Sequence, residues 1–483
     1  MKKIAFRRTK ILATLGPASE EEDVLRQMIQ KGLNAVRCNF SHGKPEEHQA
    51  RVELVRRLAK EEGKIVGILG DLQGPKIRVS RFKTKKIQLQ TGQEFTIDVN
   101  YDTEAGTESI VGTDYKALAK DLNADDILLL DDGKIELCVK AVTQGAVVCE
   151  VIQGGSLSDN KGINKKGGGL TAPALTEKDK EDIKTAARLG MDYIAISFVR
   201  HAEDVHLART LLKAAGSEAY IISKIERAEA IETPVLKEII RASEGVMVAR
   251  GDLAVEIGDA QVPAIQKKII RWALEYDRIA ITATQMMESM IESPVPTRAE
   301  ISDVVNAVLD GTDAVMLSAE TASGKFPVKS IEAMDRACLA AEKFPEVSHG
   351  AHDRDPVCER VDEAIAMATM FTADHLKVRA IVSLTEFGRT AMWMSRFRSN
   401  IPIFAFTRNA ETMQKMSLVR GVWPFFFEVT SFPKEDINRF TVQELLDQDW
   451  VEEGDLVIVT SGDFMGVHGG TNKLQVLKVG EIL

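Results

Sequence analysis

The sequence predicts an α/β protein: a (β/α)8 barrel with an inserted small antiparallel β-barrel lid domain and a C-terminal open doubly wound α/β domain. Short apolar strands alternate with amphipathic helices in eight units of about thirty residues, the pattern of such a barrel. The alternation stops after the third strand, where short strands without helices replace it. A second strand–helix series follows the eighth unit. The expected domains are 1–71 with 168–344 for the barrel, 72–167 for the lid and 345–483 for the C-terminal domain.

The composition limits the class of protein. A chain of 483 residues is too long for one ordinary core, and 44% hydrophobic with 28% charged residues is typical of a globular protein. No apolar run could span a bilayer and no secretory signal is visible, so we expect no membrane partner and a cytoplasmic location. The net charge of -10 argues against a nucleic-acid partner. The five scattered cysteines are expected to be buried thiols.

The first three barrel strands are short apolar segments separated by helices. Ser19 and Glu22 are spaced as a capping box, which predicts the start of a helix. Residues 46–60 carry the apolar spacing of a second helix. The three strands are expected at 9–17, 34–43 and 66–71.

The inserted segment lacks a helical period. Short alternating segments recur from 86 to 151, and Asp132-Gly133 and Gln144-Gly145 are turn signals between them. This pattern predicts a small antiparallel β domain. The glycine-rich residues 165–170 are expected to form a hinge where the chain returns to the barrel.

After the insertion, strands alternate with helices again. Thr176 is expected to begin a helix that ends at Leu189, and residues 363–375 are expected to form another. The turn 385–390 carries hydroxyls and a glycine before a helix, which indicates an anion site. Later barrel strands are expected at 193–198, 220–226, 246–252, 278–285 and 314–320, and C-terminal strands at 380–384, 401–406, 425–429 and 456–459.

Charged residues follow two neighbouring barrel strands. Lys224 and Glu226 end one strand and Asp252 follows the next, so all three are expected at the same edge of the barrel. Two carboxylates there suit Mg²⁺, although a pair of solvated acids or a salt bridge to Arg250 is an alternative. Lys224 shares a face with Glu226. It could stabilise a transferring phosphoryl group or an enolate, or simply pair with a carboxylate.

Polar residues also alternate at the end of the second strand. Arg37, Asn39 and Ser41, with Arg78 beyond the third strand, form a candidate phosphate cradle because arginine binds phosphate bidentately. Taken one at a time, such arginines are more often ordinary surface residues. Taken alone, Thr284 is expected to pack in the core, and His42 is expected to cap a turn or pack against its neighbours.

Seven motifs together resemble those of pyruvate kinase, and the resemblance covers nearly the whole chain. It implies phosphoryl transfer from phosphoenolpyruvate to ADP, giving pyruvate and ATP in the last step of glycolysis. It also implies a Mg²⁺ or Mn²⁺ ion, with ADP between the barrel and the lid. The motifs are RCNFSHG (37–43), GDLQGPKIR (70–78), SKIER (223–227), MVARGDLAVE (247–256), ITATQMMESM (281–290), PTRAE (296–300) and LDGTDAVMLSAETASGKFP (309–327).

The resemblance implies roles for residues at matching positions. Glu226 and Asp252 correspond to the metal ligands, and Glu320 would support the relay that protonates the enolate. The catalytic residues would be Lys224, Thr284, Arg37 and Arg78. The substrate would meet Arg37, Lys224, Gly251, Asp252, Thr284 and Ser318, and the nucleotide would meet Asn39, Arg78 and Lys161.

The sequence departs from the family at the monovalent-cation position. That position corresponds to Asn39, Ser41, Asp71 and Leu72, and Leu72 stands where threonine is common. Many members carry glutamate where this chain has Lys76. The Lys76 ammonium is expected to replace the cation, so K⁺ is not expected to be required.

The resemblance also implies regulation and assembly. A sugar-phosphate or nucleotide-monophosphate effector is expected at Thr385, Glu386, Gly388, Arg389 and Thr390, where Phe387 replaces a common serine. A homotetramer is expected. Two other functions compete with this one: a Mg²⁺-dependent aldolase or lyase of a pyruvate-like substrate, and a non-catalytic metabolite sensor.

Overall fold

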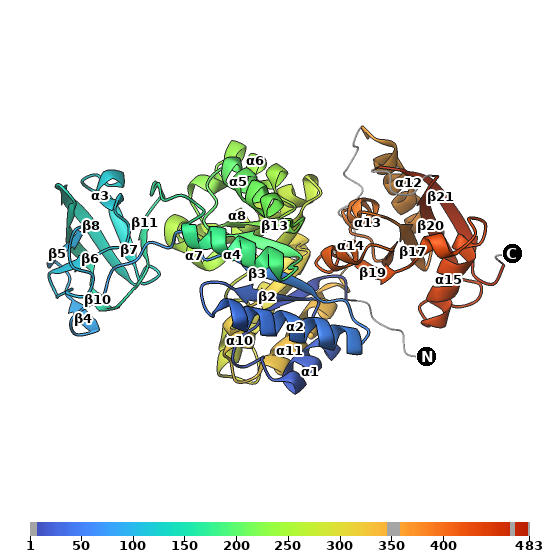
Figure 1. Cartoon of the computed structure of the whole chain (residues 1–483), viewed down its shortest axis with the longest axis horizontal. Coiled ribbons are helices and arrows are strands. Elements are labelled where there is room, and N and C mark those ends of the chain that lie inside the picture. The colour runs from blue at the N-terminus through green and yellow to red at the C-terminus, as the bar shows by residue number, and fades with distance from the viewer. Residues whose placement is uncertain (1–6, 345–357, 464–468, 482–483) are drawn as a thin grey trace.

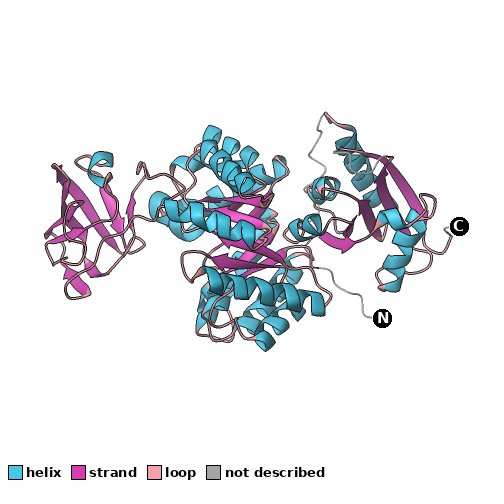
Figure 2. Cartoon of the chain, in the orientation of Figure 1, coloured by secondary structure: helices cyan, strands magenta, loops and turns pink. Residues whose placement is uncertain are grey.

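The computed structural model describes residues 7–344, 358–463 and 469–481. Three parts lie in a row, with the barrel in the middle, the inserted β domain on one side and the C-terminal domain on the other (Figure 1). Helices surround the strands of the barrel, and the inserted domain is almost entirely strand (Figure 2). The expected boundary at 344 borders on residues 345–357, which lie outside the described residues.

Eight parallel strands close the barrel in the order β1-β16-β15-β14-β13-β12-β3-β2. Most residues of these strands are buried, which explains their largely apolar sequences. The (β/α)8 prediction is therefore confirmed. The strands are β1 (Lys10–Thr14), β2 (Ala35–Asn39), β3 (Gly67–Asp71), β12 (Tyr193–Ile196), β13 (Tyr220–Ile225), β14 (Gly245–Ala249), β15 (Ile279–Ala283) and β16 (Ala314–Leu317).

The barrel helices pack their apolar stripes against the outside of the strands. The α-helices are α1 (Glu22–Gln30), α2 (Pro45–Glu61), α4 (Glu177–Arg188), α5 (Ala202–Ala214), α6 (Thr233–Ala242), α7 (Arg250–Ile257), α8 (Val262–Glu275), α9 (Arg298–Asp310), α10 (Ala319–Ala322) and α11 (Pro327–Ala341). The short 3-10 turns are η1 (Glu229–Ile231), η2 (Asp259–Gln261) and η3 (Glu288–Ile291).

Two local predictions in the barrel were wrong. Ser19 does not cap α1, because its hydroxyl accepts a hydrogen bond from Gly16 N at 3.1 Å within its own turn, and α1 begins after Glu21 without a side-chain cap. Residues 250–252 do not end the sixth strand; they form the first turn of α7. A strand pattern followed directly by a helix leaves no polar linker, so the sequence alone did not separate them.

The lid consists of a six-stranded sheet in the order β11-β7-β8-β9-β5-β6 and a two-stranded sheet of β10 and β4. The pair β5–β6 is parallel, whereas the other pairs of the lid are antiparallel. The turns at Asp132-Gly133 and Gln144-Gly145 lie where they were predicted. The elements are β4 (Lys86–Leu89), β5 (Glu94–Asp98), β6 (Ile110–Gly112), α3 (Leu118–Asp121), β7 (Ile127–Leu130), β8 (Ile135–Val142), β9 (Ala146–Gln153), β10 (Gly155–Ser158) and β11 (Ile163–Lys165).

The C-terminal domain is a five-stranded sheet in the order β19-β18-β17-β20-β21. Its last strand, β21, runs antiparallel to β20 and was not predicted. The strand predicted at 425–429 begins earlier, at Val422, because edge strand β19 tolerates Pro424. The elements are α12 (Val361–Leu376), β17 (Ala380–Leu384), α13 (Arg389–Ser395), β18 (Ile403–Thr407), α14 (Ala410–Lys415), β19 (Val422–Phe426), η5 (Val429–Ser431), α15 (Ile437–Asp447), β20 (Leu456–Gly462) and β21 (Thr471–Lys478).

The C-terminal domain forms the floor of the barrel. Leu418 and Val419 belong to the same hydrophobic cluster as Met247 and other residues inside the barrel. The Tyr193 hydroxyl donates to Lys415 O at 2.7 Å across the boundary. A fully buried ion pair joins Asp313, next to β16, to Arg396, next to α13. The interior of the barrel is therefore completed by residues far away in the sequence.

Two further sequence expectations concern the chain as a whole. Within the ranges given above, no helix has the length and apolar character needed to cross a bilayer. The thiols of Cys38, Cys138, Cys149 and Cys338 are buried, and Cys358 is half-buried.

Candidate functional site

The predicted site lies at the carboxyl ends of the barrel strands, on the side from which the lid emerges after β3 (Figure 1). Lys224 and Asp71 lie on neighbouring parts of this edge because β3, β12 and β13 are adjacent in the barrel. The residues from separate strands can therefore converge although they are far apart in the sequence.

Lys224 is the centre of a buried cluster of charges. Its Nζ lies 2.9 Å from Glu226 Oε1 and 3.5 Å from Asp71 Oδ1, and it donates to Ser197 Oγ at 2.7 Å. Arg37 joins the same cluster, with its Nε 2.6 Å from Asp71 Oδ2. The structure thus brings together two cations and two carboxylates that the sequence predicted in separate motifs.

The charges of this cluster shift the pKa values of its members. Burial disfavours the charge on Lys224, but the carboxylates of Asp71 and Glu226 outweigh it and raise the pKa of the lysine. Burial also raises the pKa of Glu226, although Lys224 opposes this, and the nearby carboxylate of Asp252 adds to it. For Asp71, burial is outweighed by Lys224 and Arg37, which lower its pKa. Lys224 therefore remains a cation at neutral pH.

Glu226 has an oxygen that suits a metal ion. Its Oε2 accepts a hydrogen bond from Phe198 N at 2.7 Å, which fixes the carboxylate. Its Oε1 is buried without a hydrogen bond of good geometry, although Lys224 lies beside it. Asp252 is half-buried in the first turn of α7. One fixed buried carboxylate oxygen and one accessible carboxylate fit a hard divalent cation, which prefers oxygen ligands.

Thr284 lies at a strained turn after β15. Its φ of 65° places a β-branched residue in the left-handed region, which costs of order 1–3 kcal/mol. Its Oγ1 accepts from Gly251 N at 3.0 Å, so the hydroxyl and this amide lie side by side. Strain of this kind persists only where the surroundings hold it.

Arg250 holds the Thr284 turn and was not predicted to do so. Its guanidinium donates to Ala283 O at 3.2 Å and to Thr284 O at 2.6 Å, and it pairs with Asp303 at 2.7 Å. The alternative of a salt bridge between Arg250 and the two acids is therefore wrong. The sequence offered only one indication of this role, which is that Arg250 lies between β14 and Gly251.

Ser318 and Glu320 lie at the end of β16. The buried carboxylate of Glu320 accepts hydrogen bonds from Ser318 N at 2.6 Å and from Met287 N at 3.1 Å. Glu320 thus ties the turn after β16 to the loop that contains Thr284. Its observed contacts are with backbone amides, which is a positioning role.

The predicted nucleotide residues are divided between two domains. Arg78 and Lys161 lie in the lid, where Arg78 pairs with Gly162 and Val79 N donates to Lys161 O at 2.9 Å. The Lys161 ammonium lies 2.6 Å from Asp131. Asn39 lies at the end of β2 in the barrel. Arg78 and Lys161 therefore form one group in the lid, and Asn39 lies in the barrel.

The residues of the monovalent-cation position surround the start of the lid. Asn39 Oδ1 accepts from Ser41 N at 3.1 Å, which turns the amide oxygen into its own loop. Leu72 O accepts from Ser197 Oγ at 2.8 Å. The Lys76 ammonium extends toward Asp252, which the sequence predicted as a metal ligand, and lies 3.5 Å from its Oδ1. A fixed positive charge therefore lies at the edge of the site.

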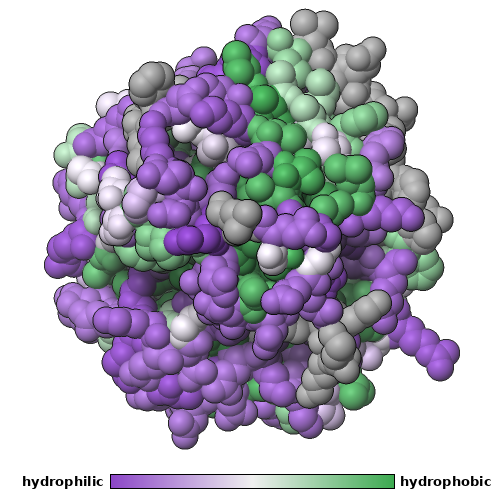
Figure 3. All heavy atoms as spheres, turned by 90° about the vertical axis from the view of Figure 1, so that its right-hand side faces the viewer, coloured by the Kyte–Doolittle hydropathy of each residue, from purple (hydrophilic) through white to green (hydrophobic). Residues whose placement is uncertain are grey.

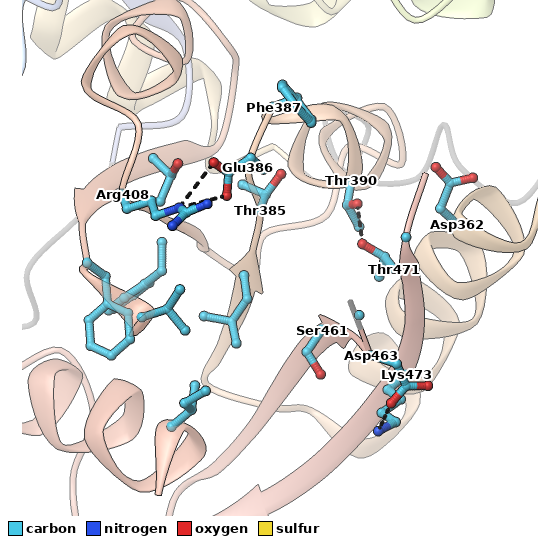
Figure 4. A pocket seen from close by; sticks show the side chains of 18 of the residues that line it. Asp362, Thr385, Glu386, Phe387, Thr390, Arg408, Ser461, Asp463, Thr471 and Lys473 are labelled. Carbon is cyan, nitrogen blue, oxygen red and sulfur yellow. Dashed lines mark hydrogen bonds and ion pairs between the residues drawn. The ribbon is translucent and has the colours of Figure 1, made fainter. Parts of the chain in front are cut away.

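The predicted effector turn lines a cavity of about 420 Å³ in the C-terminal domain (Figure 4). Thr385, Glu386, Arg389 and Thr390 line it, and Gly388 N donates to Thr385 Oγ1 at 2.9 Å just behind them. Arg408, paired with Glu386 at 3.2 Å, and Lys473, paired with Asp463, face the same space. The sequence did not predict Arg408, Lys434 and Lys473 as lining residues, because they come from other segments: two from loops and Lys473 from β21.

Ser197 and Phe198 were also missed as contacts of the site. They follow β12 in the segment that predicted the fourth strand, and each touches a member of the charged cluster. Their position at a strand end was the one available signal. Phe198 takes a φ of 56°, which directs its amide at Glu226.

Comparisons with known proteins agree along the chain. The family model described as the barrel domain of pyruvate kinase matches residues 6–331, and that described as its alpha/beta domain matches 363–477. Pyruvate kinase II of Salmonella typhimurium is 52% identical over 98% of this chain and 99% of its own length. The pyruvate kinase of Haemophilus influenzae is 51% identical, covering 95% of this chain and 96% of its own length.

Proposed function

The chain belongs to the pyruvate kinase family, and from that premise we propose how its own residues carry out the transfer. It is a phosphotransferase that converts phosphoenolpyruvate and ADP to pyruvate and ATP. One observation supports the proposed mechanism: the buried cation of Lys224 lies 2.9 Å from the buried carboxylate of Glu226, at the carboxyl ends of the barrel strands.

Lys224 and Arg37 neutralise the negative charge of the phosphoryl group. In phosphoryl transfer, charge spreads over three oxygens while the donor and acceptor oxygens lie in line, so positioning and neutralisation supply most of the catalysis. Lys224 would also stabilise the enolate oxygen left after transfer. Because Asp71 and Glu226 fix the ammonium beforehand, little reorganisation is needed during the reaction.

Family membership implies a divalent metal ion, and we assign Mg²⁺ or Mn²⁺ to Glu226 and Asp252. When bound, such an ion polarises phosphoryl oxygens and neutralises their charge. Glu226 is fixed by Phe198 N, and Asp252 by its place in α7. The remaining coordination positions are left for oxygens of the substrates.

The carboxylate of the substrate would meet the amides of Gly251 and Asp252 and the hydroxyl of Thr284. The Gly251 amide and the Thr284 hydroxyl lie 3.0 Å apart, and Arg250 holds the Thr284 turn against the start of α7. Thr284 would then be part of the path that protonates the enolate. Ser318, fixed by Glu320, would line the far side of this path.

The nucleotide would bind between the barrel and the lid. Arg78 and Lys161 would bring positive charge from the lid, and Asn39 would contact the nucleotide from the barrel. A lid that closes over the site would exclude water, which otherwise competes as the phosphoryl acceptor. We propose the domain division 1–71 with 168–344, 72–167 and 345–483, which is supported by the separate sheets of the three parts.

A coupled assay tests the proposed reaction. Purified protein with phosphoenolpyruvate, ADP and Mg²⁺ is expected to form ATP, and omission of either ADP or Mg²⁺ is expected to abolish the signal. An aldolase or lyase would turn over a pyruvate-like substrate without ADP. Absence of ATP with both substrates and the metal present would refute the proposal.

The cavity in the C-terminal domain is proposed to bind a phosphorylated sugar or a nucleotide monophosphate as an allosteric effector. Four cationic side chains line it, and the aromatic rings of Phe406 and Phe427 supply an apolar wall. A cavity of about 420 Å³ lies within the range of small-molecule sites. Arg389, whose guanidinium stacks on Trp393 at 5.0 Å, is the residue proposed to grip the phosphate.

Replacing Arg389 with alanine is expected to raise the concentration for half-maximal activation about 10- to 100-fold, since a hydrogen bond to a charged group is lost. Activation is measured with a panel of sugar phosphates and nucleotide monophosphates at low phosphoenolpyruvate. Arg439→Ala is the control, because Arg439 lies on α15 and pairs with Asp436. If Arg389→Ala responds to every compound as the original protein does, the assignment is wrong.

A homotetramer in the cytoplasm is also proposed. Val361, Phe371 and Leu376 are exposed on α12, and Val476 is exposed on the edge strand β21. Apolar side chains gather on the upper half of this end of the molecule (Figure 3). An exposed apolar helix face beside an unpaired strand edge is typical of a subunit interface.

A further inference from the structure

The lid is attached to the barrel by two connections. The one that returns to the barrel, residues 165–170, is rich in glycine. Residues 165–170 contain three consecutive glycines, and Gly167, Gly168 and Gly169 all have φ between 80° and 97°. A Cβ on Gly168 would lie 2.7 Å from the carboxylate of Glu229. Glycine is favoured here because the backbone has positive φ, and the carboxylate of Glu229 lies close above it.

Three barrel residues hold this connection: Arg227, Glu229 and Glu256, which we call the hinge latch. Arg227 Nη2 donates to Leu170 O at 2.8 Å, and Gly169 N donates to Glu229. Gly167 N donates to the backbone oxygen of Glu256 at 2.9 Å. The connection is thus tied at three successive points.

Arg227 and Glu256 are buried, Glu229 is half-buried, and Arg227 pairs with both carboxylates. Arg227 Nε lies 3.1 Å from Glu256 Oε1, with both side chains at most 4% exposed. Glu256 Oε2 accepts from Ala228 N at 2.8 Å, and Asn164 of β11 also hydrogen-bonds to this carboxylate. Burial raises the pKa of Glu256 to about 7, and Arg227 opposes that rise. Arg227 therefore favours the ionised carboxylate, but it does not fully offset the effect of burial.

The latch is adjacent to both proposed metal ligands. Arg227 directly follows Glu226, and Glu256 lies one helical turn after Asp252 on α7. The outgoing connection touches the same helix, because the ammonium of Lys76 lies 3.5 Å from Asp252. Both connections of the lid therefore rest on α7, which also carries the Gly251 amide.

We propose that Arg227 and Glu256 are positioning residues that couple the lid to the metal site, so that the position of the lid sets the position of Glu226 and Asp252. The Arg227–Glu256 pair joins the loop after β13 to helix α7, and the connection 164–170 is hydrogen-bonded to both residues. This inference rests on the assignment of Glu226 and Asp252 as metal ligands. It adds two residues that touch neither substrate nor metal.

The test uses Glu256→Gln and Arg227→Gln in the full-length protein. Each is expected to raise the Kd for Mn²⁺, measured by electron paramagnetic resonance without substrates, about 10-fold, as loss of outer support for a metal ligand does. Amide hydrogen exchange at 163–170 is expected to become faster, and KM for ADP to rise more than KM for phosphoenolpyruvate. A purely structural role would change the unfolding temperature without this pattern.

Glu244→Gln is the matched control. Glu244 also pairs with an arginine, Arg209, at 2.9 Å and also accepts a backbone hydrogen bond, from Ile221 N at 2.9 Å. It lies at the opposite end of β14 from Asp252, so the Kd for Mn²⁺ and exchange at 163–170 are expected to stay unchanged. Arg227→Lys keeps the charge and is expected to restore part of the Mn²⁺ affinity.

The outcomes separate this inference from the proposed function. If Asp252→Asn leaves Mn²⁺ binding unchanged, the metal assignment is wrong and the coupling falls with it. If Asp252→Asn weakens Mn²⁺ binding but the two latch variants do not, the metal site stands and the coupling is wrong. Faster exchange at 163–170 with unchanged Mn²⁺ affinity also overturns the proposal.

Discussion

Replacing Lys224 with methionine is expected to lower kcat for ATP formation on the order of 10³-fold, with KM for phosphoenolpyruvate changed only a few-fold. Methionine keeps much of the length of the side chain but removes the charge. The ammonium acts mainly on charge that develops during transfer, so its loss affects kcat more than ground-state binding. The measurement is steady-state ATP formation at saturating ADP and metal.

Lys224→Met also leaves Asp71 and Glu226 buried without their shared cation, so the fold must be checked by circular dichroism and thermal unfolding. Lys224→Arg keeps the charge and separates loss of charge from loss of shape. Lys325→Met, which removes an exposed partner of Glu292, is the control and should leave kcat unchanged. A folded Lys224→Met protein with more than about a tenth of the original kcat would contradict the proposed role.

The second large effect concerns the monovalent cation. The original protein is expected to reach its full rate without K⁺, because Lys76 supplies a positive charge beside Asp252. Lys76→Glu is expected to lose on the order of 10²-fold in kcat in K⁺-free buffer, and KCl is expected to restore most of it. The reason is electrostatic: a second carboxylate beside Asp252 requires a compensating cation.

The rates are compared in KCl and in a tetramethylammonium salt at equal ionic strength, which separates binding of K⁺ from general screening. Lys76→Met is the matched neutral variant, and it is expected to fall between the other two proteins. A large stimulation of the original protein by KCl, but not by tetramethylammonium, would show that Lys76 does not replace the cation.

Much of the fold could be predicted because buried barrel strands have distinctly apolar sequences. Strands such as β14 are apolar on both faces, and helices such as α2 repeat their apolar residues at helical spacing. Strand β21 was missed because most of its side chains are exposed and its sequence does not alternate. Ser19 was misread because a hydroxyl can bind its own turn as well as a helix start, and spacing cannot distinguish the two.

The candidate site was predictable where the residues lie at strand ends. Lys224 and Glu226 are two apart on one strand, so their shared direction follows from the geometry of a strand. The contacts of Arg250 could not be predicted, because they depend on a loop after a different strand taking a strained conformation. Lys76 was expected near Asp71, and its contact with Asp252 depends on how the lid leaves the barrel.

The floor of the barrel has a consequence for synthesis on the ribosome. Leu418 and Val419 lie against barrel residues such as Leu12, which are translated some 400 residues earlier. The strands can pair as they emerge, but their interior stays open at one end until the C-terminal domain is made. A nascent chain stalled before that point presents an uncovered apolar surface, so chaperones should meet this protein chiefly in its late, nearly complete form.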